Sequence, residues 1–250
     1  MANASKTPDR HGQLLEIADN LLRHLERERE DGVAVVDADP AEVKQLSELP
    51  PPVQDDTQAA LNVIAKEAAG CKKCALHRTR TKVVPGQGAM APEIMFVGEA
   101  PGFDEDQQGL AFVGRAGQLL TRMIEAMGFK REDVFIANIL KCRPPENRTP
   151  MPDEMAACLP YLRAQIALLK PKVIVALGGT AVRGLVGDET GITKLRGKWL
   201  EFEGIPTMPT LHPAYLLRNP PAKMDVWTDM QEVLRRIGRK PPVKSGSKVT

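Results

Sequence analysis

Residues 93–120 read EIMFVGEAPGFDEDQQGLAFVGRAGQLL, and this stretch decides the fold of the chain. It opens with the apolar run Ile94 to Val97, which has the length and branching of a buried parallel strand. A loop rich in glycine and acidic residues follows, and apolar residues then resume at helical spacing. The order of strand, glycine-rich loop and helix predicts an α/β sheet with a ligand crevice at the carboxyl end of the strand.

The loop matches neither of two common nucleotide-binding patterns. No G-x-G-x-x-G follows the strand, and no G-K-[ST] closes the loop. Its four acidic residues, Glu99, Asp104, Glu105 and Asp106, would also repel a diphosphate. The loop therefore favours a neutral polar ligand.

Three further apolar runs, at 134–138, 172–177 and 207–211, predict additional strands, and helical patterns alternate with them. Alternating strands and helices predict a parallel sheet covered on both faces. Residues 11–30 carry leucines on one helical face, and a proline-rich stretch with little periodicity follows. We therefore expect an N-terminal helical extension and linker at 1–56, a folded domain at 57–238 and a disordered basic tail at 239–250.

Charge is distributed unevenly along the chain. Residues 1–70 hold 14 acidic and 7 basic residues, whereas residues 71–250 hold 27 basic and 18 acidic. A basic body favours a polyanionic partner, although a solvated surface rich in lysine and arginine is the alternative. No apolar run approaches the ~18 residues of a membrane span, and residues 1–13 lack the apolar region typical of a signal peptide. We expect a cytoplasmic monomer that binds no membrane.

The four cysteines form a candidate metal site. Cys71 and Cys74 make a C-x2-C hook, and Cys142 and Cys158 lie far along the chain. In a reducing compartment such cysteines are more often ligands than disulfides. Four thiolates suit either a tetrahedral zinc ion or a [4Fe-4S] cluster, and the spacing does not distinguish them. Cys158 alone fits a buried apolar role, but that reading leaves Cys142 unexplained.

Several segments together resemble the family 4, iron-sulfur uracil-DNA glycosylases. They are GEAPGFDEDQQGLAFVGRAGQLL, FIANILKCRPPENRTP, KVIVALG, TKLRGKW, HPAYLLR and the four cysteines in order, within about residues 60–238. The resemblance implies a three-layer α/β/α sandwich with a central four-stranded parallel sheet. It also implies a [4Fe-4S] cluster on the four cysteines. The implied reaction hydrolyses the N-glycosidic bond of uracil in single- or double-stranded DNA, which leaves an abasic site in base-excision repair.

The resemblance assigns base recognition to two side chains and one backbone segment. Phe112 matches the aromatic residue that stacks on a base extruded from the helix. Asn138 matches an amide that accepts from uracil N3–H and donates to O4, a pattern that cytosine reverses. The backbone at Ala100 and Pro101 is a further candidate, although proline itself only accepts.

Catalysis is assigned to acidic residues of the loop and to one histidine. His212 matches the histidine that stabilises negative charge on the departing base. Glu99 matches the acid placed near the sugar and the attacking water, and Glu105 an acid near C5 that would exclude the methyl group of thymine. We expect Asp104 and Asp106 to be solvated loop residues.

Basic and apolar residues predict the DNA surface. The candidates for phosphate contacts are Arg143, Arg148, Lys194, Arg196, Lys198 and Arg218. Tyr215, Leu216 and Leu217 are candidates to fill the gap that an extruded base leaves.

Two alternative functions remain open at this point. A non-catalytic iron-sulfur or zinc DNA-binding protein would keep the basic surface and the cysteines, but it would not need Glu99, Phe112, Asn138 and His212 together. The DNA-crosslinking branch of the same superfamily carries a basic, histidine-containing insertion after its second strand. Here Asn138 runs directly into Ile-Leu-Lys-Cys-Arg-Pro.

Overall fold

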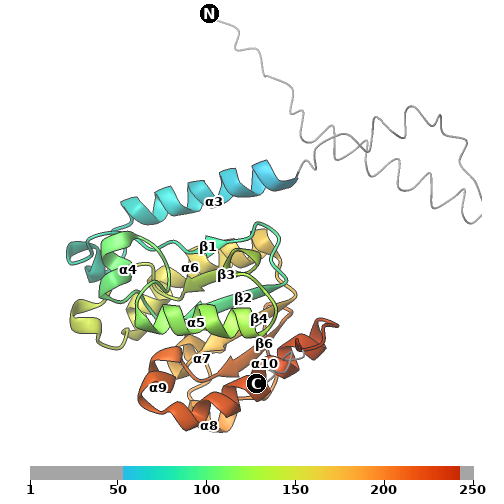
Figure 1. Ribbon diagram of the computed structural model, residues 1–250. Coiled ribbons are helices and arrows are strands. Elements are labelled where there is room, and N and C mark those ends of the chain that lie inside the picture. Colours follow the sequence, from blue (N-terminus) through green and yellow to red (C-terminus); the bar gives the residue numbers. More distant parts are fainter. Residues whose placement is uncertain (1–52, 243–250) are drawn as a thin grey trace, which may run out of the picture. The chain divides into compact units, whose positions relative to one another are not determined.

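The computed structural model describes residues 53–242. Within them a six-stranded sheet has the order β1-β3-β2-β4-β6-β5 (Figure 1). The four central strands pair in parallel, and each edge strand pairs antiparallel to its neighbour. The strands are β1 (Gln87–Gly88), β2 (Ile94–Gly98), β3 (Phe135–Asn138), β4 (Val173–Leu177), β5 (Leu200–Phe202) and β6 (Ile205–Thr210).

The predicted parallel sheet of four strands is confirmed as the centre, and the two edge strands correct the strand number to six. β1 spans two residues, too few to show a periodic pattern. β5 joins β6 through Glu203 and Gly204, whose φ values of 50° and 79° are those of a tight hairpin turn. A search for buried apolar runs misses both strands, because neither β1 nor β5 is a continuous run of buried apolar residues.

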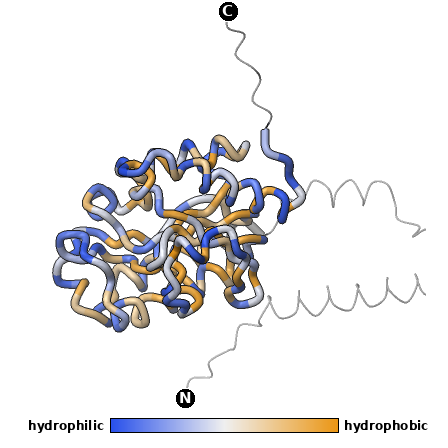
Figure 2. The backbone as a smooth tube through the Cα atoms, turned by 90° about the horizontal axis from the view of Figure 1, so that it is seen from below, coloured by the Kyte–Doolittle hydropathy of each residue, from blue (hydrophilic) through white to orange (hydrophobic). Residues whose placement is uncertain are grey.

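Helices cover both faces of the sheet, which confirms the three-layer arrangement. One face packs against α3 (Val53–Gly70), α6 (Pro152–Leu169) and α7 (Gly179–Val186), and the other against α5 (Arg115–Ala126), α9 (Pro213–Arg218) and α10 (Lys223–Arg236). Side chains of β2 alternate between the faces, since Met95 and Val97 join the first cluster whereas Ile94 and Phe96 join the second. Hydrophobic segments accordingly run through the interior (Figure 2).

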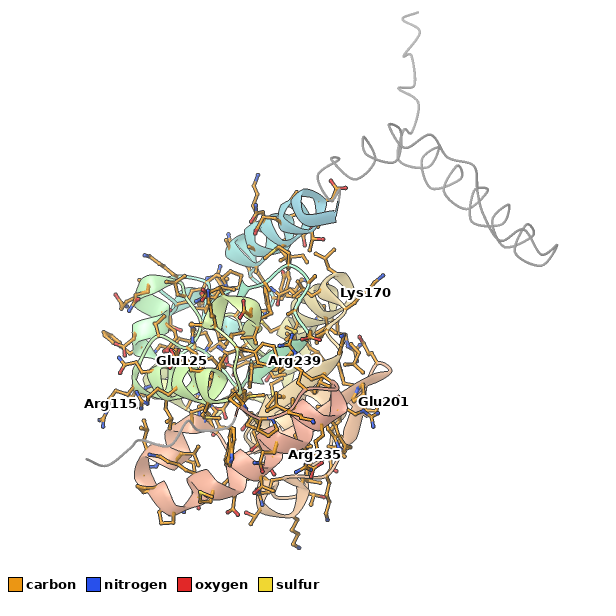
Figure 3. The ribbon with its side chains drawn as sticks, turned by 45° about the vertical axis from the view of Figure 1, so that its right-hand side comes forward. Arg115, Glu125, Lys170, Glu201, Arg235 and Arg239 are labelled. Atoms are coloured by element: carbon orange, nitrogen blue, oxygen red, sulfur yellow. The ribbon has the colours of Figure 1, made fainter. Side chains whose placement is uncertain are left out.

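Two features of the structure lie at the predicted domain boundaries. Helix α3 begins at Val53, four residues earlier than predicted. The predicted tail includes Arg239, which is labelled in Figure 3. Its guanidinium pairs with Glu93 at 2.5 Å and lies over the ring of Phe129. The predicted helix at 11–30 and most of the predicted tail lie outside the described residues. None of the described helices has both the length and the apolarity to cross a bilayer.

Candidate active site

A cavity of about 470 Å³ lies where β2, β3 and β6 end. This is the edge at which the strand-loop-helix order predicts a ligand crevice. The predicted residues that line the cavity are Glu99, Ala100, Pro101, Glu105, Phe112, Asn138, Arg148, His212 and Arg218. The fold therefore gathers in one place residues that are far apart in the sequence.

Asn138 ends β3 and faces the cavity with a free hydrogen-bond acceptor. The residue is 1% exposed, and its Oδ1 atom has no hydrogen-bond partner among the described residues. A Cβ atom at Gly98 would lie 2.4 Å from this oxygen, so only glycine leaves room for the amide there. A buried acceptor without a partner is costly, and a ligand that donates to it would remove that cost.

The position of Phe112 requires glycine at Gly117 as well as at Gly98. Phe112 has φ +53°, and its ring lies 5.7 Å from the ring of His212, measured between centroids. A Cβ atom at Gly117 would lie 1.9 Å from the Phe112 carbonyl oxygen, and one at Gly98 would lie 2.5 Å from the ring. These glycines bring the aromatic ring against the wall of the cavity next to Asn138.

Glu105 holds the Phe112 loop through backbone hydrogen bonds. One carboxylate oxygen accepts from the N–H groups of Val113 and Gly114, each at 2.9 Å, and the other accepts from Gly102 N at 3.1 Å. Three bonds of this kind fix the carboxylate as a brace between the two arms of the loop. The predicted contact between Glu105 and C5 of a base stays a prediction.

Glu99 lies directly after β2, beside the end of β3. Hydrogen bonds continue past the strand ends, from Ile139 N to Gly98 O at 2.9 Å and from Leu140 N to Glu99 O at 3.0 Å. These bonds keep the acid next to Asn138 at the same edge of the sheet.

His212 begins α9 as its N-terminal cap, and its tautomer follows from the hydrogen bonding. The backbone N–H of Ala214 donates to Nδ1 at 3.1 Å, so Nδ1 carries a lone pair and Nε2 carries the proton. Burial, and secondarily the charge of Arg218, lowers the pKa of His212 to about 4. The imidazole is therefore a neutral N–H donor at physiological pH.

The predicted DNA-contacting residues differ in their exposure and in whether an acidic side chain already pairs with them. Lys194, on α8 (Ile192–Leu195), and Lys198 are exposed, and Arg218 lines the cavity. Arg148 also lines the cavity, but it forms a bidentate pair with Glu154 at 2.8 and 2.6 Å. Arg148 therefore presents little unpaired charge to a phosphate.

Arg196 is held inside the domain. It donates to both carboxylate oxygens of Asp229, at 3.2 and 2.7 Å, and to the carbonyl oxygen of Asp225. The pair supports β6, because Thr210 Oγ1 donates to the same Asp229 carboxylate at 2.7 Å. The predicted phosphate contact of Arg196 would require its ion pair with Asp229 to break.

Leu216 corrects one prediction. Its side chain is 1% exposed and packs in the apolar cluster beneath α9, so it cannot fill a gap in a DNA helix without leaving the core. Tyr215 points outward on the same helix and is 42% exposed. The wedge prediction therefore stays with Tyr215 and with the partly buried Leu217. The alternation of buried and exposed positions on α9 could not be read from HPAYLLR alone.

All four predicted cysteine ligands line a second, smaller cavity: Cys71, Cys74, Cys142 and Cys158. Arg80 Nη1 donates to Cys142 Sγ and Lys141 N to Cys158 Sγ, each at 3.1 Å. Burial raises the pKa of the Cys142 thiol, and it raises that of Cys158 to about 11. Within residues 53–242 no three histidine, cysteine or acidic side chains converge closely enough to hold a single metal ion.

The sequence missed several other residues of the first cavity, namely Gly102, Ala116, Pro144, Asn147 and Ala214. Asn147 has φ +55° in the loop after β3, and its Oδ1 accepts from Arg143 Nε at 2.8 Å. The signal that could have found it is the turn-forming run Pro-Pro-Glu-Asn beside Asn138.

Comparisons with known proteins match the part of the chain that builds this cavity. Residues 85–232 match the family described as the Uracil DNA glycosylase superfamily. A type-4 uracil-DNA glycosylase of Thermotoga maritima is 50% identical over 161 residues, which are 64% of this chain and 84% of that protein. One of Archaeoglobus fulgidus is 42% identical over 191 residues, 73% of this chain and 96% of that protein. A type-5 uracil-DNA glycosylase of Pyrobaculum aerophilum is 31% identical over 171 residues, 61% and 74% respectively.

Proposed function

Since the chain belongs to the uracil-DNA glycosylase superfamily, we propose that it removes uracil from DNA and so begins base-excision repair. The reaction is hydrolysis: the bond between C1′ of the deoxyribose and N1 of uracil breaks. The oxygen of water bonds to C1′, and the base leaves as free uracil. The product is DNA with an abasic site.

One observation carries the proposal: the buried, unpaired Oδ1 atom of Asn138 at the wall of the cavity. Uracil offers an N–H donor at N3 and a carbonyl acceptor at C4, which an amide side chain satisfies together. Cytosine has an acceptor at N3 and a donor at C4, so both contacts would fail. Each buried group left unpaired costs about 1–3 kcal/mol, enough to select between the two bases.

The other residues of the cavity supply stacking and charge stabilisation. The ring of Phe112 would cover one face of the extruded base, and the neutral His212 would donate its Nε2 proton to O2 of uracil. That hydrogen bond strengthens as the base leaves with negative charge, so it lowers the barrier. Glu99, beside Asn138, would orient the attacking water and stabilise positive charge on the sugar.

We propose a [4Fe-4S] cluster as the resident group of the second cavity. All four predicted cysteine ligands line this one cavity, as the ligands of a single cluster must. N–H groups already donate to Cys142 and Cys158, as they do to sulfur ligands of such clusters. When bound, the cluster would tie the segment after α3 to α6, and no step of the hydrolysis passes through it.

Incubation of the purified protein with a labelled oligonucleotide that contains one uracil tests the function. After alkali treatment we expect strand cleavage at the uracil and none at thymine or cytosine in matched oligonucleotides. Asn138→Ala should lower cleavage at uracil and reduce the difference in cleavage between uracil and the other bases. An uncleaved but retarded band would instead favour the non-catalytic DNA-binding alternative. Gel filtration and cell fractionation test the further proposal of a cytoplasmic monomer.

A further inference from the structure

Two exposed aromatic side chains flank the active-site cavity. Among the described residues, the large hydrophobic side chains that are exposed include only two aromatics, Phe103 at 57% and Tyr215 at 42%. Phe103 directly follows Gly102, and Tyr215 directly follows Ala214, and both of those neighbours line the cavity. Tyr215 belongs to the predicted DNA surface, whereas the part played by Phe103 remains to be explained.

Phe103 is the first residue of α4 (Phe103–Gln108), and a cation supports one face of its ring. The guanidinium of Arg143 lies 5.1 Å from the ring centroid, within the range of a cation–π contact. Arg143 is held in turn by the bond from its Nε to Asn147 Oδ1, and Asn147 lines the cavity. Phe103 is 57% exposed, so much of its side chain remains open to solvent beside this contact.

Two of the three acidic residues that follow Phe103 are less exposed than Phe103 and accept backbone hydrogen bonds. Glu105 accepts from three backbone N–H groups. Asp106 is 1% exposed, and its two carboxylate oxygens accept from Thr81 N at 2.9 and 3.1 Å. Asp104 is the one exposed acid of the three. An exposed aromatic side chain backed by an arginine is thus left at the rim of a cavity that takes a base.

We propose that Phe103 is a stacking platform for the base next to the extruded uracil, with Arg143 backing the ring and facing the phosphates. The proposal rests on the proposed function. Extrusion of a nucleotide leaves each neighbouring base with one unstacked face, and any base offers a π-face to an aromatic side chain. Stacking therefore gives affinity at the rim without requiring a particular sequence.

A cycle of protein and substrate changes tests the platform. Binding is measured with single-stranded oligonucleotides that contain 2′-deoxy-2′-fluorouridine, whose fluorine disfavours the oxocarbenium-like state and slows cleavage. The neighbour on the 5′ side, or that on the 3′ side, is replaced by an abasic analogue. With both neighbours present, Phe103→Ala should weaken binding about 5- to 150-fold. With the stacked neighbour removed, wild type and variant should bind equally.

Matched variants separate stacking from a general loss of apolar surface. Phe103→Trp should bind as wild type does, whereas Phe103→Leu should lose most of the effect. Val63→Ala, on α3 at the same 57% exposure, should change nothing. A loss for Phe103→Ala that is the same on all three substrates, or no loss at all, would overturn the platform. Cleavage of ordinary uracil DNA by the wild-type protein is measured separately, so a failure of the glycosylase function is recognised on its own.

Discussion

His212 shows how one backbone hydrogen bond sets the chemistry of a side chain. Because Ala214 N–H occupies Nδ1, the proton must sit on Nε2, and burial keeps the ring uncharged. A neutral donor gains strength as charge develops on the departing base, whereas an imidazolium would bind the ground state strongly as well.

The activity should accordingly lack the titration of an ordinary histidine. We expect the single-turnover rate of uracil release to stay flat from about pH 8 to pH 5 as far as His212 is concerned, and to fall as the pH approaches 4. His212→Ala should lower the plateau roughly 100- to 1000-fold, as loss of an oxyanion donor does. An inflection near pH 6.5 that disappears in the variant would contradict the neutral assignment.

The same lowered pKa makes a prediction for stability. In the folded state His212 stays unprotonated down to about pH 4. In the unfolded chain it takes up a proton near pH 6.5, the ordinary pKa of histidine. The contribution of His212 to stability is therefore complete above pH 6.5 and is lost as the pH falls toward 4. Denaturation by urea should show that the free energy of unfolding of the wild type falls between pH 6.5 and pH 4. The fall should be smaller in His212→Ala.

Sequence alone located most residues of the cavity but not the roles of its acids. Phe112, Asn138 and His212 stand in long motifs, so a resemblance could place them. Glu105 and Asp106 look alike in the sequence, and both were expected to face a ligand or solvent. Both accept backbone hydrogen bonds, and Asp106 is buried rather than solvated, which depends on where the loop and the Thr81 segment meet in the fold.

At the level of elements, an ion pair with a buried carboxylate supports β6, the strand that leads to His212. Arg196 follows α8, Asp229 lies within α10, and Thr210 ends β6, so the pair joins three elements at one point. Burial raises the pKa of the Asp229 carboxyl, and the charge of Arg196 opposes that shift. The network explains why a basic residue that resembles a phosphate contact is directed inward.

Removal of Arg196 should therefore cost stability before it costs DNA affinity. Arg196→Ala leaves the Asp229 carboxylate buried without its partner, and we expect a loss of about 3 kcal/mol, the lower end for such a pair because Arg196 is partly exposed. Lys198→Ala, two residues away and exposed, should stay within about 0.5 kcal/mol and weaken DNA binding only. Urea denaturation and salt-dependent binding measure the two effects. Unchanged stability with weakened binding in Arg196→Ala would restore it to the DNA surface.

On the scale of the whole molecule, the cysteine cavity and the active-site cavity are joined by two short paths. Lys141 donates its backbone N–H to Cys158 and its Nζ to the carbonyl oxygen of Asn138 at 3.0 Å. Arg80 donates to Cys142, and the next residue, Thr81, donates to Asp106 on α4. The layered fold could be predicted from alternating strands and helices, but these paths could not, because each depends on loops that meet only after folding.

Removal of the proposed cluster should therefore loosen the active-site cavity before it unfolds the sheet. Without the cluster the cysteine cavity would lose its cross-link, and the hydrogen bonds to sulfur and to Asn138 would weaken. Each bond contributes about 0.5–1.5 kcal/mol, so amide exchange at Thr81 and Lys141 should speed up by roughly 2- to 10-fold. Exchange in α10, which packs on the opposite face, should change little, and uracil release should slow in parallel.

Iron and sulfide analysis with the absorbance near 400 nm reports cluster content, and hydrogen exchange by mass spectrometry reports the loosening. An iron-free protein that releases uracil at the original rate, with unchanged exchange at both amides, would separate the two cavities and contradict the coupling.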